Sequence, residues 1–163
     1  MQKFAGRTLI RVLPEGDIFA ALLKSDFIPL PSAVVRREAY WAVGGIDSRL
    51  RYSEDFDLFV KIAQIYTVRA VQEVVCLYRI HGGNLCLSMG DGGFQEGLTV
   101  VRRYLPLATA KRALTYHHTY HAVGMIKAGK FSRGFVHLIR DGGLWVAFSE
   151  LAKRLFGKVS PKA

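Results

Sequence analysis

The residues of this chain best suited to chemistry are the adjacent carboxylates Glu54 and Asp55, in the run 53–58 (SEDFDL). A carboxylate held beside a substrate hydroxyl can remove its proton, which is general-base chemistry. Adjacent acids at the start of a helix also have a simpler use, because the unpaired N–H groups there stabilise negative charge. On the residues alone, helix capping and catalysis both remain open for this pair.

The element that must position these acids is a helix beginning near Ser53, which is its natural N-cap. Spacings of three and four place four apolar side chains on one face, namely those of Phe59, Ile62, Ala63 and Tyr66. We expect Asp57 to cap or anchor nearby backbone, because residues two apart on a helix do not share a face.

Two short helices are predicted before this one. Asp17 can cap a helix running to about Lys24. Residues 37–43 favour a second helix that ends at Gly44 and Gly45, since glycine adopts the left-handed conformation at helix ends.

The remaining elements make the chain α/β in its first part and helical in its second. Prolines and β-branched residues favour an extended segment at 27–35, and apolar density predicts buried strands at 67–71 and 74–80. The glycines of 89–93 predict a loop. Helices are then expected at 94–104, 109–128, 132–139 and 144–156, with an αα-hairpin turn at 128–131. Around the helix expected at 132–139, helical spacing indicates a core or interface stripe formed by Phe131, Phe135, Leu138 and Ile139.

Four segments in a fixed order carry a resemblance to a known family. They are 28–38 (IPLPSAVVRRE), 43–47 (VGGID), 53–58 (SEDFDL) and 77–81 (LYRIH). Together they resemble the second half of the family 2 glycosyltransferases, which have the GT-A fold, over roughly residues 17–88. Four motifs in the right order are far more specific than any one of them.

This resemblance implies roles for individual residues. Asp55 would be the catalytic base, removing a proton from the acceptor hydroxyl, and Glu54 would orient or support it. The loop containing Gly44, Gly45 and Asp47 would line the sugar donor and acceptor. The reaction implied is an inverting transfer from a nucleotide-sugar donor to a hydroxyl acceptor, in polysaccharide, glycan or glycolipid synthesis.

The last motif implies a metal site. His81 would bind the divalent cation, Mg²⁺ or Mn²⁺, that neutralises the departing diphosphate. Arg79 lies two residues earlier, so on a strand both side chains would project to the same side, toward one diphosphate.

The nucleotide-binding half of a GT-A enzyme, with its Asp-x-Asp metal motif, is not found before Asp17. The sequence Asp55-Phe56-Asp57 does not replace it, because two carboxylates at that spacing diverge around a helix axis. We therefore expect a partial GT-A domain at 1–88, on the acceptor side, followed by a basic helical extension at 89–163. Such a chain would be inactive alone.

The formal net charge of +10 belongs mainly to the tail. Residues 109–163 hold ten Lys and Arg against two Asp and Glu, whereas residues 1–108 hold 13 against 11. A basic helical tail suits an anionic membrane surface, although a solvated helical face remains open. The alternative function is thus a noncatalytic module that binds a membrane or a partner through 109–163. No nucleic-acid docking motif accompanies the charge, so no nucleic acid is expected.

Other signals bear on location and on metals. Cys76 and Cys86 form no C-x-x-C motif, and the start of the chain has no signal-peptide pattern. Both observations favour a cytoplasmic protein. If the basic tail binds lipid, the protein would be peripheral at the inner membrane face. His117 and His121 form an i, i+4 pair, the spacing of paired helical metal ligands. No Glu follows His117 and no third ligand is evident, so a metal site is not indicated there.

Overall fold

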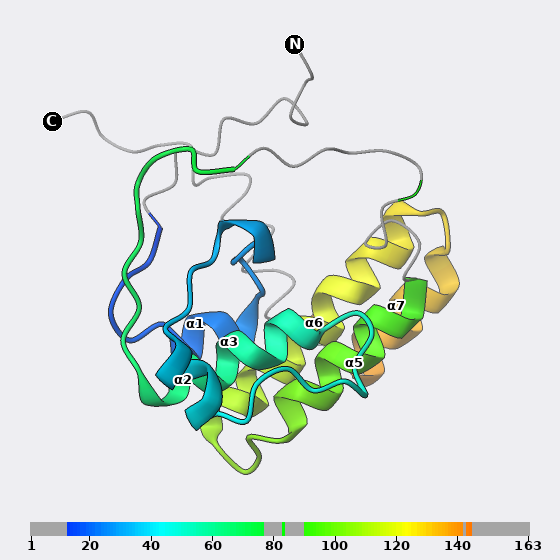
Figure 1. The fold of residues 1–163 in the computed structure, drawn as a ribbon. Helices are drawn as coiled ribbons and strands as arrows, with labels where there is room; N and C mark the ends of the chain where they lie inside the picture. The colour runs from blue at the N-terminus through cyan, green and yellow to red at the C-terminus, as the bar shows by residue number, and fades with distance from the viewer. Residues whose placement is uncertain (1–12, 77–82, 84–89, 142, 145–163) are drawn as a thin grey trace, which may run out of the picture. The chain divides into compact units, whose positions relative to one another are not determined.

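The structure is a computed structural model that describes residues 13–76, 83, 90–141, 143 and 144 (Figure 1). The chain divides into two compact units, Met1–Arg103 and Tyr104–Ala163. The predicted domain boundary at residue 88 lies outside the described residues. Because the first unit ends at Arg103, the helix Gly90–Arg102 belongs to the first unit.

Helix α3 (Glu54–Ile65) is the centre of the first unit, where it packs against α1 (Phe19–Lys24), α2 (Arg37–Ala42) and α5 (Gly90–Arg102) (Figure 1). Because α3 has neighbours on several sides, its apolar surface is wider than a single stripe. The buried apolar side chains of this unit include Ile18, Leu22, Leu23, Phe56, Leu58, Phe59, Val60, Ile62, Leu98, Val100 and Val101. Tyr66, which the sequence places on the buried face, is 39% exposed because it lies beyond the last turn of α3.

The predicted start of α1 and end of α2 are confirmed. Asp17 Oδ1 accepts a hydrogen bond from the backbone N–H of Phe19, at 3.1 Å. Gly44 and Gly45 have φ angles of +78° and +66°. Their N–H groups donate to the carbonyl oxygens of Trp41 (3.1 Å) and Tyr40 (2.9 Å), which is the double hydrogen bond of a Schellman motif.

The expected α/β class is not confirmed, because the described residues form helices and no β-strand. In the segment predicted as the strand 67–71, Val68 forms an isolated antiparallel bridge with Gly16, with N···O distances of 2.8 and 3.0 Å. A strand needs a partner along its whole length to pair its backbone groups, and this segment has such a partner at one position among the described residues. The second predicted strand, 74–80, lies partly outside those residues.

The predicted loop at 89–93 is wrong over residues 90–93, because α5 begins at Gly90. Glycine indicates turns, but it also allows close packing. A Cβ on Gly92 would lie 3.0 Å from the ring of Tyr52. The extended segment predicted at 27–35 contains a 3₁₀ turn at Leu30–Ser32, with extended backbone at Pro29 and Ala33 on either side.

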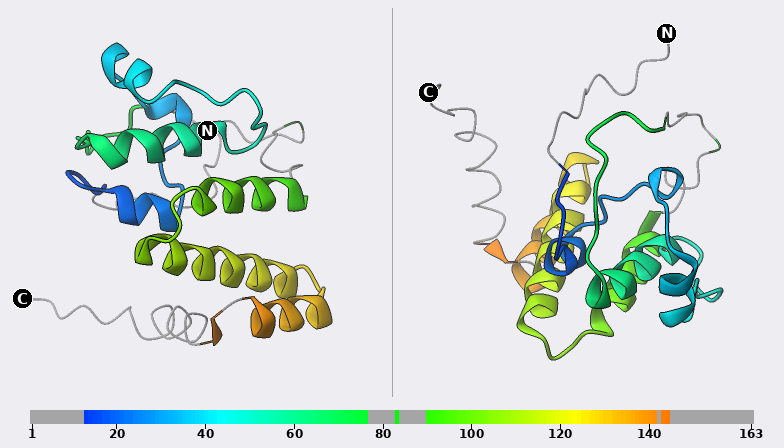
Figure 2. Two further views of the ribbon diagram at one scale, coloured as in Figure 1. Left: turned by 90° about the horizontal axis from the view of Figure 1, so that it is seen from below. Right: turned by 60° about the vertical axis from the view of Figure 1, so that its left-hand side comes forward.

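The second unit contains an antiparallel helix pair, α6 (Ala108–Lys127) and α7 (Phe131–Arg140), which lie side by side in both views of Figure 2. The predicted αα-hairpin turn is confirmed. Gly129 has a φ of +78°, and the N–H groups of Gly129 and Lys130 donate to Ile126 O (3.0 Å) and Met125 O (2.9 Å). The helices approach closely at Gly134, where a Cβ would lie 2.6 Å from Ile126 Cγ1.

Helix α7 buries a narrower face than its sequence suggests. Of its predicted stripe, Leu138 is buried, whereas Phe131, Phe135 and Ile139 are 67%, 58% and 60% exposed. The last predicted helix, 144–156, lies outside the described residues apart from Leu144. Within the described part of the chain, no helix has both the length and the apolar character needed to cross a bilayer.

Candidate active site

Glu54 and Asp55 occupy the first turn of α3, as the sequence predicts. Asp55 Oδ1 accepts a hydrogen bond from the backbone N–H of Phe56, at 2.8 Å. Both side chains are partly exposed, but Glu54 Oε2 is buried and has no hydrogen-bond partner among the described residues. A buried acceptor without a donor costs free energy, which sets this oxygen apart from an ordinary solvated helix-start carboxylate.

A third carboxylate, Asp26, belongs to the same site. It follows α1 and lies close enough to Asp55 for the two negative charges to interact. Loss of surrounding water and, second, the charge of Asp55 raise the pKa of Asp26 to about 6, while a hydrogen bond from the Ile28 N–H opposes this shift. Asp26 keeps an exposed surface, so its proton can exchange with solvent. The site therefore pairs an acid that titrates near neutral pH with a second carboxylate.

The backbone leading into α3 is held by Glu96, which projects from α5. Its carboxylate accepts hydrogen bonds from the N–H groups of three successive residues, Arg51 (3.0 Å), Tyr52 (2.7 Å) and Ser53 (3.1 Å). Ser53 is the N-cap residue of α3, as predicted, but its side chain makes no capping hydrogen bond. The Phe56 N–H, which an N-cap side chain could bind, donates to Asp55 Oδ1 instead.

The prediction that Asp57 caps or anchors nearby backbone is corrected, because its partners among the described residues are side chains. Its side chain is fully buried and forms ion pairs with Lys61 (2.9 Å) and with Arg103, which follows α5. Lys61 also donates to the carbonyl oxygen of Gly45, at 2.7 Å. Asp57 therefore fastens the glycine loop and the end of α5 to α3, the helix that carries Glu54 and Asp55.

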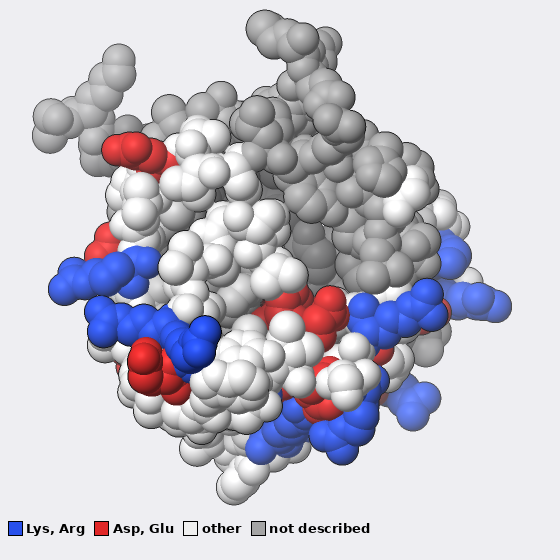
Figure 3. Space-filling view, viewed as in Figure 1, with Lys and Arg blue, Asp and Glu red and all other residues white. Residues whose placement is uncertain are grey.

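Asp47 is held in the same network. Arg49 makes a two-pronged contact with it, through Nε to Oδ1 and Nη2 to Oδ2, both at 2.9 Å. Arg103 Nη2 donates to Oδ2 as well, at 2.9 Å. The Arg49 hydrogen bonds, with a smaller contribution from Arg103, hold the pKa of Asp47 well below its usual range. Figure 3 shows acidic side chains beside basic ones near the middle of the face in view.

The structure thus brings Gly44, Gly45 and Asp47 to one loop tied to α3. Arg79 and His81, the predicted diphosphate and metal residues, lie outside the described residues. The functions of all these residues remain predictions from the resemblance.

The chain matches a family described as glycosyltransferase-like family 2 over residues 7–125, which is most of its length. It belongs to that family. The match extends well beyond the segment 17–88 that the motifs suggest, and it includes α5 and most of α6. Searches of curated proteins and of solved structures found no match. Family membership makes the chain a glycosyltransferase by resemblance and indicates no particular sugar or acceptor.

Sequence reasoning missed Asp26, Glu96 and Arg103. Each is a single charged residue that reaches the site from a distant part of the chain. Lys61 could have been found, because its spacing of four from Asp57 is that of a helical ion pair.

Proposed function

We propose that this chain forms the acceptor side of an inverting, metal-dependent glycosyltransferase that uses a nucleotide-sugar donor. One observation supports this most strongly. Within a chain of this family, the first turn of α3 presents Asp55 beside Asp26, with a buried Glu54 oxygen that has no partner among the described residues. The alternative of simple helix capping accounts for the hydrogen bond from the Phe56 N–H to Asp55, but among the described residues it gives the buried Glu54 Oε2 no donor.

In the proposed reaction, Asp55 takes the proton of the acceptor hydroxyl. The acceptor oxygen forms a bond to the anomeric carbon as the bond from that carbon to the diphosphate breaks, and the nucleoside diphosphate leaves with the electron pair. The hydrogen bond from the Phe56 N–H fixes one Asp55 oxygen, which orients the carboxylate for this transfer. Glu54 is placed to accept a further hydrogen bond from the acceptor.

Metal dependence is a further part of the proposal. Carboxylate oxygens are ligands that Mg²⁺ and Mn²⁺ prefer, but among the described residues Asp26, Glu54 and Asp55 do not form a group of converging metal ligands, so this part of the proposal rests on the family resemblance. A bound divalent cation would neutralise the charge on the leaving diphosphate, with His81 as the ligand that the resemblance implies.

The test is a transfer assay on the protein expressed from its complete gene. Release of nucleoside diphosphate is measured with a panel of nucleotide sugars, with and without a membrane extract as the source of acceptors, and with EDTA or added Mg²⁺ or Mn²⁺. We expect release that needs both an acceptor and a divalent cation. Acceptor-dependent release that is unaffected by EDTA would exclude metal dependence. No release with any donor would contradict the proposed activity.

A second proposal concerns location, and it rests on the exposed face of α7. Phe131, Phe135 and Ile139, at spacings of four, form an exposed apolar line on this helix. Exposed Arg133 and Arg140 lie on the same helix. Apolar side chains with flanking basic residues suit an interface helix on anionic lipid, which would place the protein at the inner face of the membrane.

Sedimentation with vesicles tests this second proposal. Wild-type protein should bind vesicles containing phosphatidylglycerol more tightly than vesicles of phosphatidylcholine alone. Phe131→Ser with Phe135→Ser should weaken binding, whereas Val34→Ser, at a fully exposed valine of the first unit, should not. Equal binding by all three proteins would exclude α7 as the anchor.

A further inference from the structure

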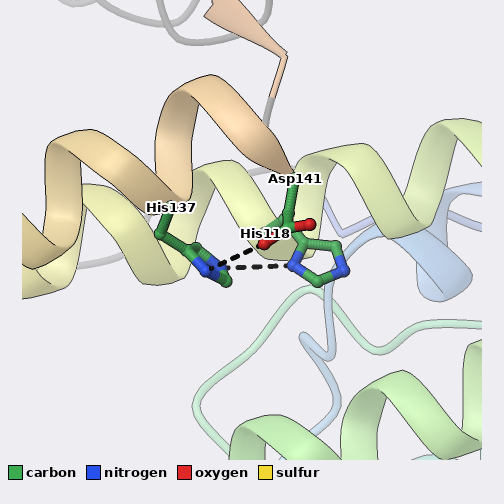
Figure 4. Close-up of side chains that lie close together, drawn as sticks. All are labelled: His118, His137 and Asp141. Atoms are coloured by element: carbon green, nitrogen blue, oxygen red, sulfur yellow. Dashed lines mark hydrogen bonds and ion pairs between the residues drawn. The ribbon is translucent and has the colours of Figure 1, made fainter.

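The second unit holds a cluster of chemically active side chains that glycosyl transfer does not use. His118 projects from α6, His137 from α7, and Asp141 follows the end of α7 (Figure 4). One ligand atom from each of the three lies within 4.8 Å of the other two. His137 and Asp141 are four residues apart, so the side chain of Asp141 lies next to His137 at the end of α7.

The two imidazoles meet at the separation expected of ligands to one ion. His118 Nδ1 and His137 Nε2 are 3.2 Å apart. Two nitrogens bound to a tetrahedral Zn²⁺ at about 2.0–2.1 Å lie roughly 3.3–3.4 Å from each other. The separation of the two nitrogens is therefore close to that of two ligands on one zinc ion.

Asp141 occupies the position of a supporting carboxylate. Its Oδ2 lies 3.4 Å from His137 Nδ1, the nitrogen on the side away from His118. When Nδ1 donates its hydrogen to Asp141, the lone pair of Nε2 faces His118, as metal binding requires. His137 is only 20% exposed, which limits competition from water.

The backbone around the cluster is well fixed. The Schellman turn at Gly129 and the close approach at Gly134 set the separation of α6 and α7. Thr119, adjacent to His118, is buried and accepts a hydrogen bond from the Gly143 N–H at 3.1 Å, which holds Gly143 against α6. The His121 ring lies edge-on to His137, with centroids 5.4 Å apart, so a further imidazole borders the cluster.

We propose that His118 and His137 bind a Zn²⁺ ion between α6 and α7, with Asp141 holding His137 in the binding tautomer. The site takes Zn²⁺ rather than Mg²⁺, because imidazole nitrogen suits transition metals whereas Mg²⁺ prefers oxygen. This site is separate from the Mg²⁺ or Mn²⁺ proposed for transfer, and neither proposal depends on the other.

The experiment is a calorimetric titration of tag-free, EDTA-treated protein with Zn²⁺ and, separately, with Mg²⁺. We expect one Zn²⁺ per chain and no heat from Mg²⁺ at this site. His118→Gln and His137→Gln should each abolish binding, and Asp141→Asn should weaken it about 10- to 100-fold. His117→Gln is the matched control, since it removes the neighbouring imidazole of α6, which is not part of the cluster, and it should bind as wild type does.

Two results would overturn the proposal. One is the absence of Zn²⁺ binding by the wild-type protein, which would leave the cluster a hydrogen-bonded His–His–Asp chain. The other is an equal loss of binding in His117→Gln and His118→Gln. Circular dichroism of each variant without metal checks folding. The visible spectrum of wild-type protein with Co²⁺ reports tetrahedral nitrogen ligation without any variant, so a misfolded variant leaves the proposal testable.

Discussion

Replacement of Glu96 by alanine should destabilise the first unit by loosening the backbone before α3. The carboxylate accepts hydrogen bonds from three N–H groups, of which those of Tyr52 and Ser53 are partly buried and that of Arg51 is exposed. Water can replace the lost partner of the exposed group at little cost. Each partly buried group should cost about 1–1.5 kcal/mol, so Glu96→Ala should lower the free energy of unfolding by about 2–3 kcal/mol.

Graded variants make this prediction sharper. Glu96→Gln keeps one acceptor oxygen and loses the charge, so we expect a loss of about 1 kcal/mol. Gln95→Ala, at the exposed neighbouring position of α5, makes none of these contacts and should leave stability within about 0.5 kcal/mol of wild type.

Urea denaturation measures the global effect, and amide hydrogen exchange locates it. A local loss of 2–3 kcal/mol should speed exchange at Tyr52 and Ser53 by about 30- to 150-fold, since 1.4 kcal/mol is a factor of ten. If Glu96→Ala changes neither the unfolding free energy nor the exchange at these two positions, Glu96 does not hold the start of α3.

Three further predictions follow from the same unit. Asp57→Asn should lower the free energy of unfolding, measured by urea denaturation, by about 2–3 kcal/mol; this is less than is usual for a buried ion pair because Lys61 and Arg103 can reach water. Arg49→Gln replaces an arginine that is 83% exposed, so it should lower that free energy by less than about 1 kcal/mol. Equal losses in the two variants would refute this distinction. Gly44→Ala should lower the free energy of unfolding by about 1 kcal/mol, because residue 44 has a left-handed backbone. Gly45→Ala should lower it by about 1–3 kcal/mol more, because its Cβ would lie 2.8 Å from the Tyr40 ring. Identical unfolding midpoints for the two variants would show that this contact has no effect on stability. The pKa of Asp26 is raised to about 6, so wild-type protein should lose stability as the pH rises from about 4 to 6. Asp26→Asn should therefore be more stable than wild type at pH 8, by on the order of 1 kcal/mol after allowance for solvent screening. Parallel curves of stability against pH for the two proteins would contradict this.

The parts of the fold that sequence predicted well depend on local chemistry. Helix α3 follows from apolar spacing, and the helix ends at Gly44 and Gly129 follow from the left-handed backbone that glycine permits. The strand expected at 67–71 depends instead on a partner, and composition cannot supply one. The glycines of 90–93 look like a turn in sequence, and the packing of Gly92 against Tyr52 depends on a distant segment that local sequence cannot indicate.

The candidate site likewise contains some residues that a local motif indicates and others that only the folded structure reveals. Glu54 and Asp55 could be selected from one short motif, since both sit in the first turn of one helix. Asp26 and Glu96 reach that turn from 29 and 42 positions away, measured from Asp55 and Glu54 respectively, so no local spacing indicates them. The pairing of His118 with His137 was missed for the same reason, because it depends on two helices packing against each other.

The central claim is that Asp55 is the base of a glycosyl transfer, and its most direct test is steady-state kinetics of Asp55→Asn in the protein expressed from its complete gene. The account predicts that kcat falls by about 10²- to 10⁴-fold while the affinity for the nucleotide sugar is nearly unchanged, because the variant loses proton transfer and keeps the donor contacts. Glu38→Gln, at an exposed acid of α2, should retain wild-type kinetics. Transfer by Asp55→Asn at the wild-type rate would contradict the account.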